Sequence, residues 1–116
     1  MLFYERLGFR STMTSRFPMG AEFGDVTMMQ QGTIVIDLYQ FPPSELQAIA
    51  RRSNGHIDHI AFDVADIDQA YTTLKSEGHQ ILEEAPVFLP FWKNGCKYFN
   101  ITGPDGERLE FNQILP

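Results

Sequence analysis

Two stretches of this sequence carry a histidine and a carboxylate in the alternating pattern that is typical of strands. In residues 56–64, apolar side chains alternate with a second set that contains His59. In residues 107–113, polar and apolar side chains alternate again, and Glu110 belongs to the polar set. Successive side chains of a strand point to opposite faces, so we expect His59 and Glu110 on the inward face of a sheet. Zinc, iron, manganese and nickel accept imidazole and carboxylate together, which indicates a metal site.

The elements that must position these strands are predicted by capping and turn signals. Asp66 can cap a helix over 67–77, which Gly78 ends. A Gly-Pro-Asp-Gly turn at 103–106 precedes the last strand, 107–114. We expect the remaining strands at 9–17, 25–30, 33–39 and 97–101, further helices at 2–7 and 45–51, a short extended segment at 80–83, and loops at 18–24 and 85–93.

Asp37 and an aromatic loop are further candidates for a site. Asp37 alternates with apolar residues in the strand 33–39, where an unpaired buried carboxylate would be costly. We therefore expect it to bind a metal or to pair with a base. Residues 88–92 read Phe-Leu-Pro-Phe-Trp, which is a large apolar surface for a free loop. This loop is expected to close a pocket, or to pack on the sheet rim or at a dimer interface.

Length, charge and cysteine content limit the possible classes of protein. The chain has 116 residues, enough for one domain. Its net charge of −6 argues against binding to nucleic acid or to anionic membranes. A single cysteine, Cys96, excludes an internal disulfide and fits a reducing compartment. No apolar run approaches the roughly 20 residues of a membrane span, and no signal peptide is recognisable, so we expect a cytoplasmic protein.

The two halves of the chain repeat each other. The pattern of residues 3–8 returns at 70–78, and that of 36–40 returns at 109–113. The strand that carries His59 has no counterpart before Phe3. The sequence thus predicts an incomplete first module over 1–41, a connector at 42–55 and a second module at 56–116, within a single domain.

These motifs together resemble the glyoxalase, bleomycin-resistance and extradiol dioxygenase family, the vicinal oxygen chelate superfamily, and most closely its glyoxalase I (lactoylglutathione lyase) branch. The residues that carry the resemblance are 3–9 (Phe-Tyr-Glu-Arg-Leu-Gly-Phe), 36–38 (Ile-Asp-Leu), 58–64 (Asp-His-Ile-Ala-Phe-Asp-Val) and 103–111 (Gly-Pro-Asp-Gly-Glu-Arg-Leu-Glu-Phe). The resemblance implies an α+β fold of tandem βαβββ modules that form a half-open, curved mixed sheet around a cavity. The first module here would lack its first strand.

The resemblance also implies a site. His59 and Glu110 match the metal ligands of the second module, and Asp37 stands where the glyoxalase I branch has a glutamate. The implied cofactor is a divalent metal, Zn, Ni, Mn or Fe, and the implied assembly is a homodimer. Residues expected to contact the substrate are Tyr39, Phe88, Phe91, Trp92, Tyr98, Asn100 and Arg108.

Three functions remain open at this point. The first is a metal-dependent lyase or isomerase that acts on a small oxygenated substrate, in which the metal stabilises an enolate and Glu110 moves the proton. The second is a metal-free protein that binds an aromatic or cationic compound, as in the bleomycin-resistance branch, through stacking and cation–π contacts. The third is an extradiol-type dioxygenase with iron.

Overall fold

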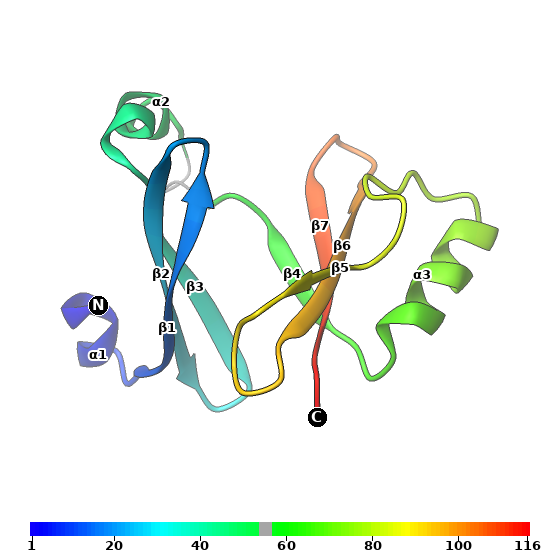
Figure 1. Ribbon diagram of the computed structural model, residues 1–116, viewed down its shortest axis with the longest axis horizontal. Helices are drawn as coiled ribbons and strands as arrows, with labels where there is room; N and C mark the ends of the chain where they lie inside the picture. The colour runs from blue at the N-terminus through cyan, green and yellow to red at the C-terminus, as the bar shows by residue number, and fades with distance from the viewer. Residues whose placement is uncertain (54–56) are drawn as a thin grey trace. The chain divides into compact units, whose positions relative to one another are not determined.

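The computed structural model describes residues 1–53 and 57–116, which form two compact units, Met1–His56 and Ile57–Pro116 (Figure 1). Each unit is described by itself. The end of the predicted connector and the start of the predicted second module fall on residues 54–56, outside the described residues. No helix in the described ranges is both long and apolar enough to cross a membrane.

The first unit is a short helix followed by a three-stranded antiparallel sheet. Its elements are α1 (Leu2–Arg6), β1 (Arg10–Met19), β2 (Glu22–Gln31), β3 (Ile34–Gln40), the 3-10 helix η1 (Pro43–Glu45) and α2 (Leu46–Ala50). The strand order is β1-β2-β3, so within residues 1–53 this sheet has no strand equivalent to the one that carries His59. The prediction of a loop at 18–24 was wrong. Met19 pairs with Glu22, so a two-residue hairpin at Gly20, whose φ is +63°, replaces most of that loop.

The second unit is a four-stranded mixed sheet with one long helix. Its elements are β4 (Ile60–Asp63), α3 (Ile67–Ser76), β5 (Val87–Leu89), β6 (Cys96–Thr102) and β7 (Arg108–Ile114). The strand order is β4-β7-β6-β5, with β4 parallel to β7 and the other neighbours antiparallel. The fold is therefore α+β with two open sheets, as the sequence predicted.

Two boundaries in this unit differ from the prediction. A strand was expected at 56–64, and among its described residues, 57–64, β4 spans only Ile60–Asp63, because these four residues are the ones that pair with β7. His59 lies immediately before the strand. The loop expected at 85–93 contains β5, because Val87–Leu89 pairs with the start of β6.

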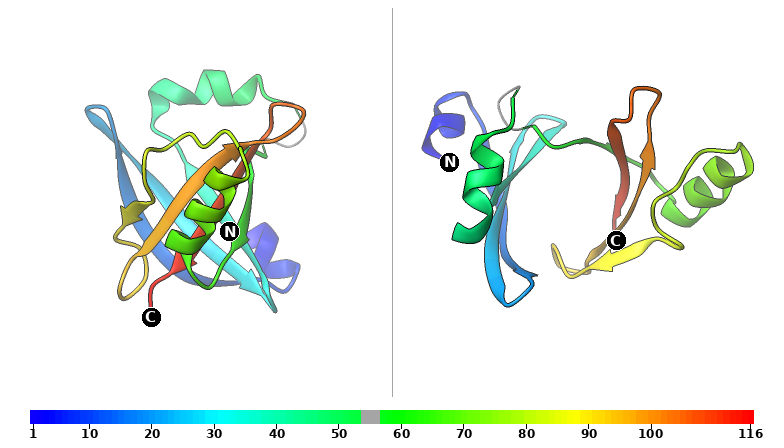
Figure 2. Two further views of the ribbon diagram at one scale, coloured as in Figure 1. Left: turned by 90° about the vertical axis from the view of Figure 1, so that its right-hand side faces the viewer. Right: turned by 90° about the horizontal axis from the view of Figure 1, so that it is seen from above.

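Helix α3 covers one face of this sheet, as both views of Figure 2 show. The helix begins where the Asp66 carboxylate accepts a hydrogen bond from the Gln69 backbone N–H at 3.0 Å, as the capping pattern predicted. Ile67, Phe99 and Ile101 are buried between helix and sheet. Leu109 and Phe111 of β7 pack against this core. The polar residues of β7 consequently belong to the opposite face of the sheet.

Candidate polar site on the second sheet

The face of the second sheet that points away from α3 collects the polar residues of three strands. In the β6–β7 register, Asn100 pairs with Glu110 and Tyr98 with Asn112. In the parallel β4–β7 register, Ala61 pairs with Glu110. Directly paired residues lie on the same face, and His59, two residues before Ala61, shares the side of Ala61. The sheet register thus brings His59 to Glu110.

A hydrogen-bonded cluster holds the His59 ring. Its Nδ1 lies 2.8 Å from Oδ2 of Asp58 and 2.8 Å from Nη2 of Arg108. Arg108 also forms an ion pair with Asp58. A carboxylate only accepts and a guanidinium only donates, so Nδ1 can hydrogen-bond only one of them at a time. A protonated Nδ1 donates to Asp58, and an unprotonated Nδ1 accepts from Arg108. The Nδ1–H tautomer leaves a lone pair on Nε2.

Nε2 of His59 faces Glu110. It lies 3.7 Å from Oε2, and the two side chains are 22% and 15% exposed, respectively. The same Oε2 atom accepts a hydrogen bond from Nδ2 of Asn112 at 3.5 Å. His59 and Glu110 are therefore partly withdrawn from water and directed at each other, which strengthens any interaction they make with a shared ligand.

Asn100 is the buried polar residue on this face. It is 6% exposed, and the carboxylate of Glu83 accepts both its backbone N–H at 2.6 Å and its Nδ2 at 2.9 Å. Its Oδ1 atom has no hydrogen-bond partner within residues 1–53 and 57–116. The amide is thus held from one side only.

Tyr98 stands beside these carboxylates. Burial raises the pKa of its hydroxyl, and the negative charges of Glu83 and Glu110 and the neighbouring Cys96 raise it further. Tyr98 therefore keeps its proton well above neutral pH and offers this face a hydrogen-bond donor.

The predicted residues of the first unit are on β3. Asp37 is exposed and pairs with Met28 of β2 in the sheet register. The Tyr39 ring lies 5.3 Å from that of Phe17 and stacks on that of Phe41 at 5.9 Å. The structure brings His59 and Glu110 together within the second unit, whereas Asp37 and Tyr39 belong to the first.

The aromatic loop is divided between core and surface. Phe91 is 5% exposed and therefore packs inward, whereas Phe88 on β5 is 53% exposed. Trp92 is half-buried, with its ring 6.3 Å from that of Phe91. Its φ of 58° is a left-handed conformation that is uncommon for a bulky residue.

His59 and Glu110 fit part of a metal site. Nitrogen and oxygen ligands about 2.1 Å from one ion are roughly 3–4 Å apart, a range that includes their separation. Asp58 at Nδ1 is the type of partner that orients a metal-bound histidine. Across the two described ranges, however, three or more histidine, cysteine or acidic side chains do not gather into a ligand set. The described part of the second unit thus offers two candidate ligands and not a complete set.

Three polar residues around the site were not predicted from the sequence: Asp58, Glu83 and Asn112. Asp58 directly precedes His59, but it does not follow the alternation of that segment. Asn112 lies two residues after Glu110, and the alternation of residues 107–113 was a usable signal for it. Glu83 comes from the segment between α3 and β5, and only the folded chain brings it to Asn100.

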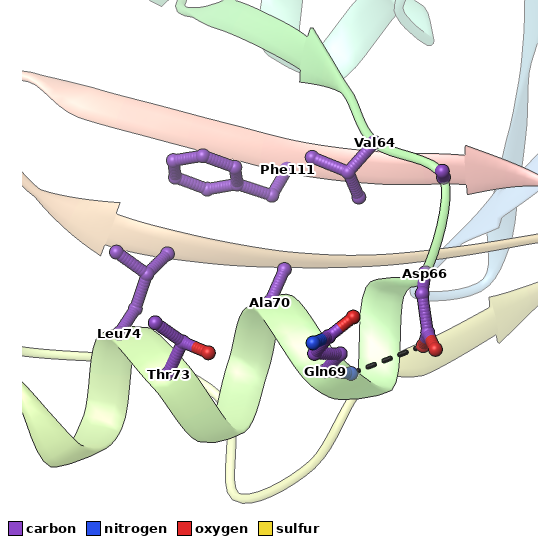
Figure 3. Close-up of a pocket in the computed structure, with 8 residues that line it drawn as sticks. Val64, Asp66, Gln69, Ala70, Thr73, Leu74 and Phe111 are labelled. Carbon is purple, nitrogen blue, oxygen red and sulfur yellow. Dashed lines mark hydrogen bonds between the residues drawn. The ribbon is translucent and has the colours of Figure 1, made fainter.

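A separate apolar hollow lies on the α3 side of the sheet (Figure 3). It has a volume of about 400 Å³, and its lining includes Val64, Ala70, Leu74 and Phe111. Phe111 and Glu110 are consecutive on β7, so this hollow and the polar site are on opposite faces.

Comparison with known proteins identifies the family. The family model described as Glyoxalase/Bleomycin resistance protein/Dioxygenase superfamily matches residues 1–111. The chain belongs to this superfamily. The assignment agrees with the α+β modules and with the resemblance found in the sequence.

Two individual proteins are similar to this chain, one in sequence and one in fold. Uncharacterized protein YwbC of Bacillus subtilis (strain 168) is 40% identical over 78 residues, which cover 67% of this chain and 56% of YwbC. The chain thus matches little more than half the length of this curated relative. The crystal structure of hypothetical protein BH1468 from Bacillus halodurans C-125 superposes with a TM-score of 0.71 at 21% identity, over 99% of this chain and 83% of that one. This likeness supports the fold alone.

Proposed function

We propose that this protein is a glyoxalase-like, metal-dependent lyase or isomerase that acts on a small oxygenated substrate. The observation that supports this proposal best is the orientation of His59. Its Nε2 faces Glu110 at 3.7 Å, while its Nδ1 is hydrogen-bonded to Asp58. A histidine held in this way presents Nε2 as a ligand. The proposed ion is a divalent metal, and the proposed assembly is a homodimer.

His59 and Glu110 would hold the ion on the polar face of the second sheet. A bound divalent ion supplies Lewis-acid stabilisation of an enolate or a related oxyanion. Asn112 hydrogen-bonds Oε2 of Glu110 and so fixes the carboxylate that would move the substrate proton. Asp37, from the same chain or from a second copy, is the proposed further ligand, and Tyr98 would donate a hydrogen bond to the substrate.

Metal content measured by plasma mass spectrometry tests this proposal. Purified protein would be loaded with nickel, zinc, iron or manganese, and unbound metal then removed by gel filtration. The variants are His59→Ala and Glu110→Gln. His79→Ala is a matched control, because His79 also pairs with a carboxylate, Glu77, at 3.6 Å, but lies after α3.

We expect about one ion per chain or per pair of chains, lost in both site variants and kept in the control. An Asp37→Asn variant that also loses the ion would support Asp37 as a ligand. Wild-type protein that holds no ion after loading with any of the four metals would contradict the metal-dependent proposal. A metal-loaded protein would then be assayed for isomerisation of hemithioacetals.

A second candidate is a metal-free protein that binds a small aromatic or cationic compound. The observation in its favour is that, among the described residues, no third histidine, cysteine or acidic side chain completes a ligand set with His59 and Glu110. The two groups of aromatic rings, around Tyr39 and around Phe91, suit a flat ligand. The extradiol dioxygenase alternative needs a second histidine. Within residues 1–53 and 57–116 the other histidine is His79, which pairs with Glu77 instead.

A further inference from the structure

We propose that Asn100, held by Glu83, selects ligands that carry an N–H or O–H group. Asn100 would accept a hydrogen bond from that group through Oδ1, beside Glu110. The inference rests on the proposed function, because it places the ligand on the same polar face of the second sheet.

The first step is the orientation of the amide. Both oxygens of Glu83 accept hydrogen bonds from Asn100, one from the backbone N–H at 2.6 Å and one from Nδ2 at 2.9 Å. A carboxylate has no proton to donate, so the nitrogen of the amide must face Glu83 and the oxygen must face away. Glu83 therefore acts as a positioning residue that determines which end of Asn100 is available.

The second step is the location of Oδ1. The backbone of Asn100 points toward the segment before β5, since its N–H bonds to Glu83 and its carbonyl oxygen accepts the N–H of Leu82. Asn100 and Glu110 are thus a pair without ladder hydrogen bonds between them, and side chains of such pairs lie especially close. Oδ1 therefore belongs to the same small area as the Glu110 carboxylate.

The third step is the unused acceptor. Asn100 is 6% exposed and its Oδ1 has no partner in the described part of the chain. Buried polar atoms are nearly always hydrogen-bonded, and an exception calls for an explanation. Tyr98 and Glu110 flank the amide on the same face, and neither is fully buried. Rotation of such side chains on binding is common, and it would let a donor group of the ligand reach Oδ1.

Two probes of nearly identical shape test this inference. Indole carries one N–H donor, and benzofuran replaces that N–H by an oxygen that cannot donate. Affinities would be measured by two-dimensional NMR titration of protein freed of metal with EDTA. Binding without metal separates this test from the proposed function, which depends on metal content.

We expect wild-type protein to bind indole roughly fivefold more tightly than benzofuran, the effect of one hydrogen bond. Glu83→Gln gives the amide a donor that bonds Oδ1, so that Nδ2 of Asn100 turns toward the ligand. The preference for indole should then vanish or reverse. Asn100→Leu should remove it, and Glu84→Gln, a change at the neighbouring exposed glutamate, should preserve it.

Thermal unfolding and the dispersion of the NMR spectrum would establish that each variant is folded. Equal affinity of wild-type protein for the two probes, or binding of neither, would overturn the inference. An unchanged preference for indole in folded Asn100→Leu would overturn it as well. A protein that binds metal but does not distinguish the probes would retain the proposed function and lose only the role of Asn100.

Discussion

Oδ2 of Asp58 lies 2.8 Å from Nδ1 of His59, on the side of the ring opposite to Glu110. The two residues are consecutive in the chain and precede β4, so the backbone itself holds the carboxylate against the ring. Arg108 at the start of β7 pairs with the same carboxylate and ties the cluster to the next strand. This arrangement predicts that Asp58 governs the affinity of His59 for a metal.

Asp58→Asn should lower the affinity for Zn²⁺ or Ni²⁺ by about 10–100-fold, because a neutral amide supports the Nδ1–H tautomer less well than a carboxylate. Isothermal titration calorimetry would measure the change. Asp68→Asn, on α3 and therefore on the other side of the sheet, is the control and should leave the affinity unchanged. Equal affinities in wild type and Asp58→Asn would show that Asp58 does not orient the ring.

Ile67→Ala should destabilise the second unit by roughly 2–5 kcal/mol, since Ile67 is fully buried at the start of α3. Urea unfolding followed by circular dichroism would measure the free energy of unfolding. Ile57→Ala is a matched control at a position that is 76% exposed, and its effect should stay within about 0.5 kcal/mol. A similar loss in both variants would contradict the observed packing of α3.

Gly95→Ala and Gly78→Ala separate backbone strain from a steric clash. Both glycines have positive φ, +83° and +87°, so alanine should cost about 1–2 kcal/mol at either position. A Cβ at Gly95 would also lie 2.2 Å from the Phe88 ring, whereas nothing is near Gly78. We therefore expect Gly95→Ala to lower the free energy of unfolding by about 1–3 kcal/mol more than Gly78→Ala does, as measured by urea unfolding. A smaller loss at Gly95 than at Gly78 would argue against the contact with Phe88.

Tyr98 should make the free energy of unfolding depend on alkaline pH. Its pKa is raised in the folded protein by burial and by Glu83 and Glu110, whereas in the unfolded chain it ionises near pH 10. The folded state therefore holds the proton longer, and stability falls as pH rises from about 10 through the folded pKa. Tyr98→Phe should remove this part of the pH dependence. Beside the free energy of unfolding, tyrosinate absorbance would report the ionisation of Tyr98. Glu83→Gln should bring the pKa of Tyr98 back toward its usual value.

The sequence alone predicted most of the local structure of the second unit. Asp66 caps a helix because its carboxylate needs only the N–H three residues later, and the face of α3 that packs on the sheet follows from helical spacing. Alternation likewise placed Glu110 on the face opposite Phe111. These outcomes depend on contacts within a few residues, which a single segment already contains.

Predictions that depended on pairing were less accurate. β4 spans only Ile60–Asp63, because these are the residues that pair with β7. β5 is a strand because Val87–Leu89 pairs with β6. The sequence of a segment such as 85–93 does not itself indicate that it will pair with β6. Strand boundaries are therefore decided by partners distant in the chain.

The sequence by itself determined the superfamily, through motifs that resemble it, and with it the expected α+β modules. Strand period was enough to predict His59 and Glu110 on polar strand faces. Only the tertiary structure showed that Asp58 and Arg108 hold the His59 ring and that Glu83 fixes the Asn100 amide. The physical reason is that hydrogen bonds require atoms within about 3 Å, and local spacing cannot specify such distances between segments far apart in the chain.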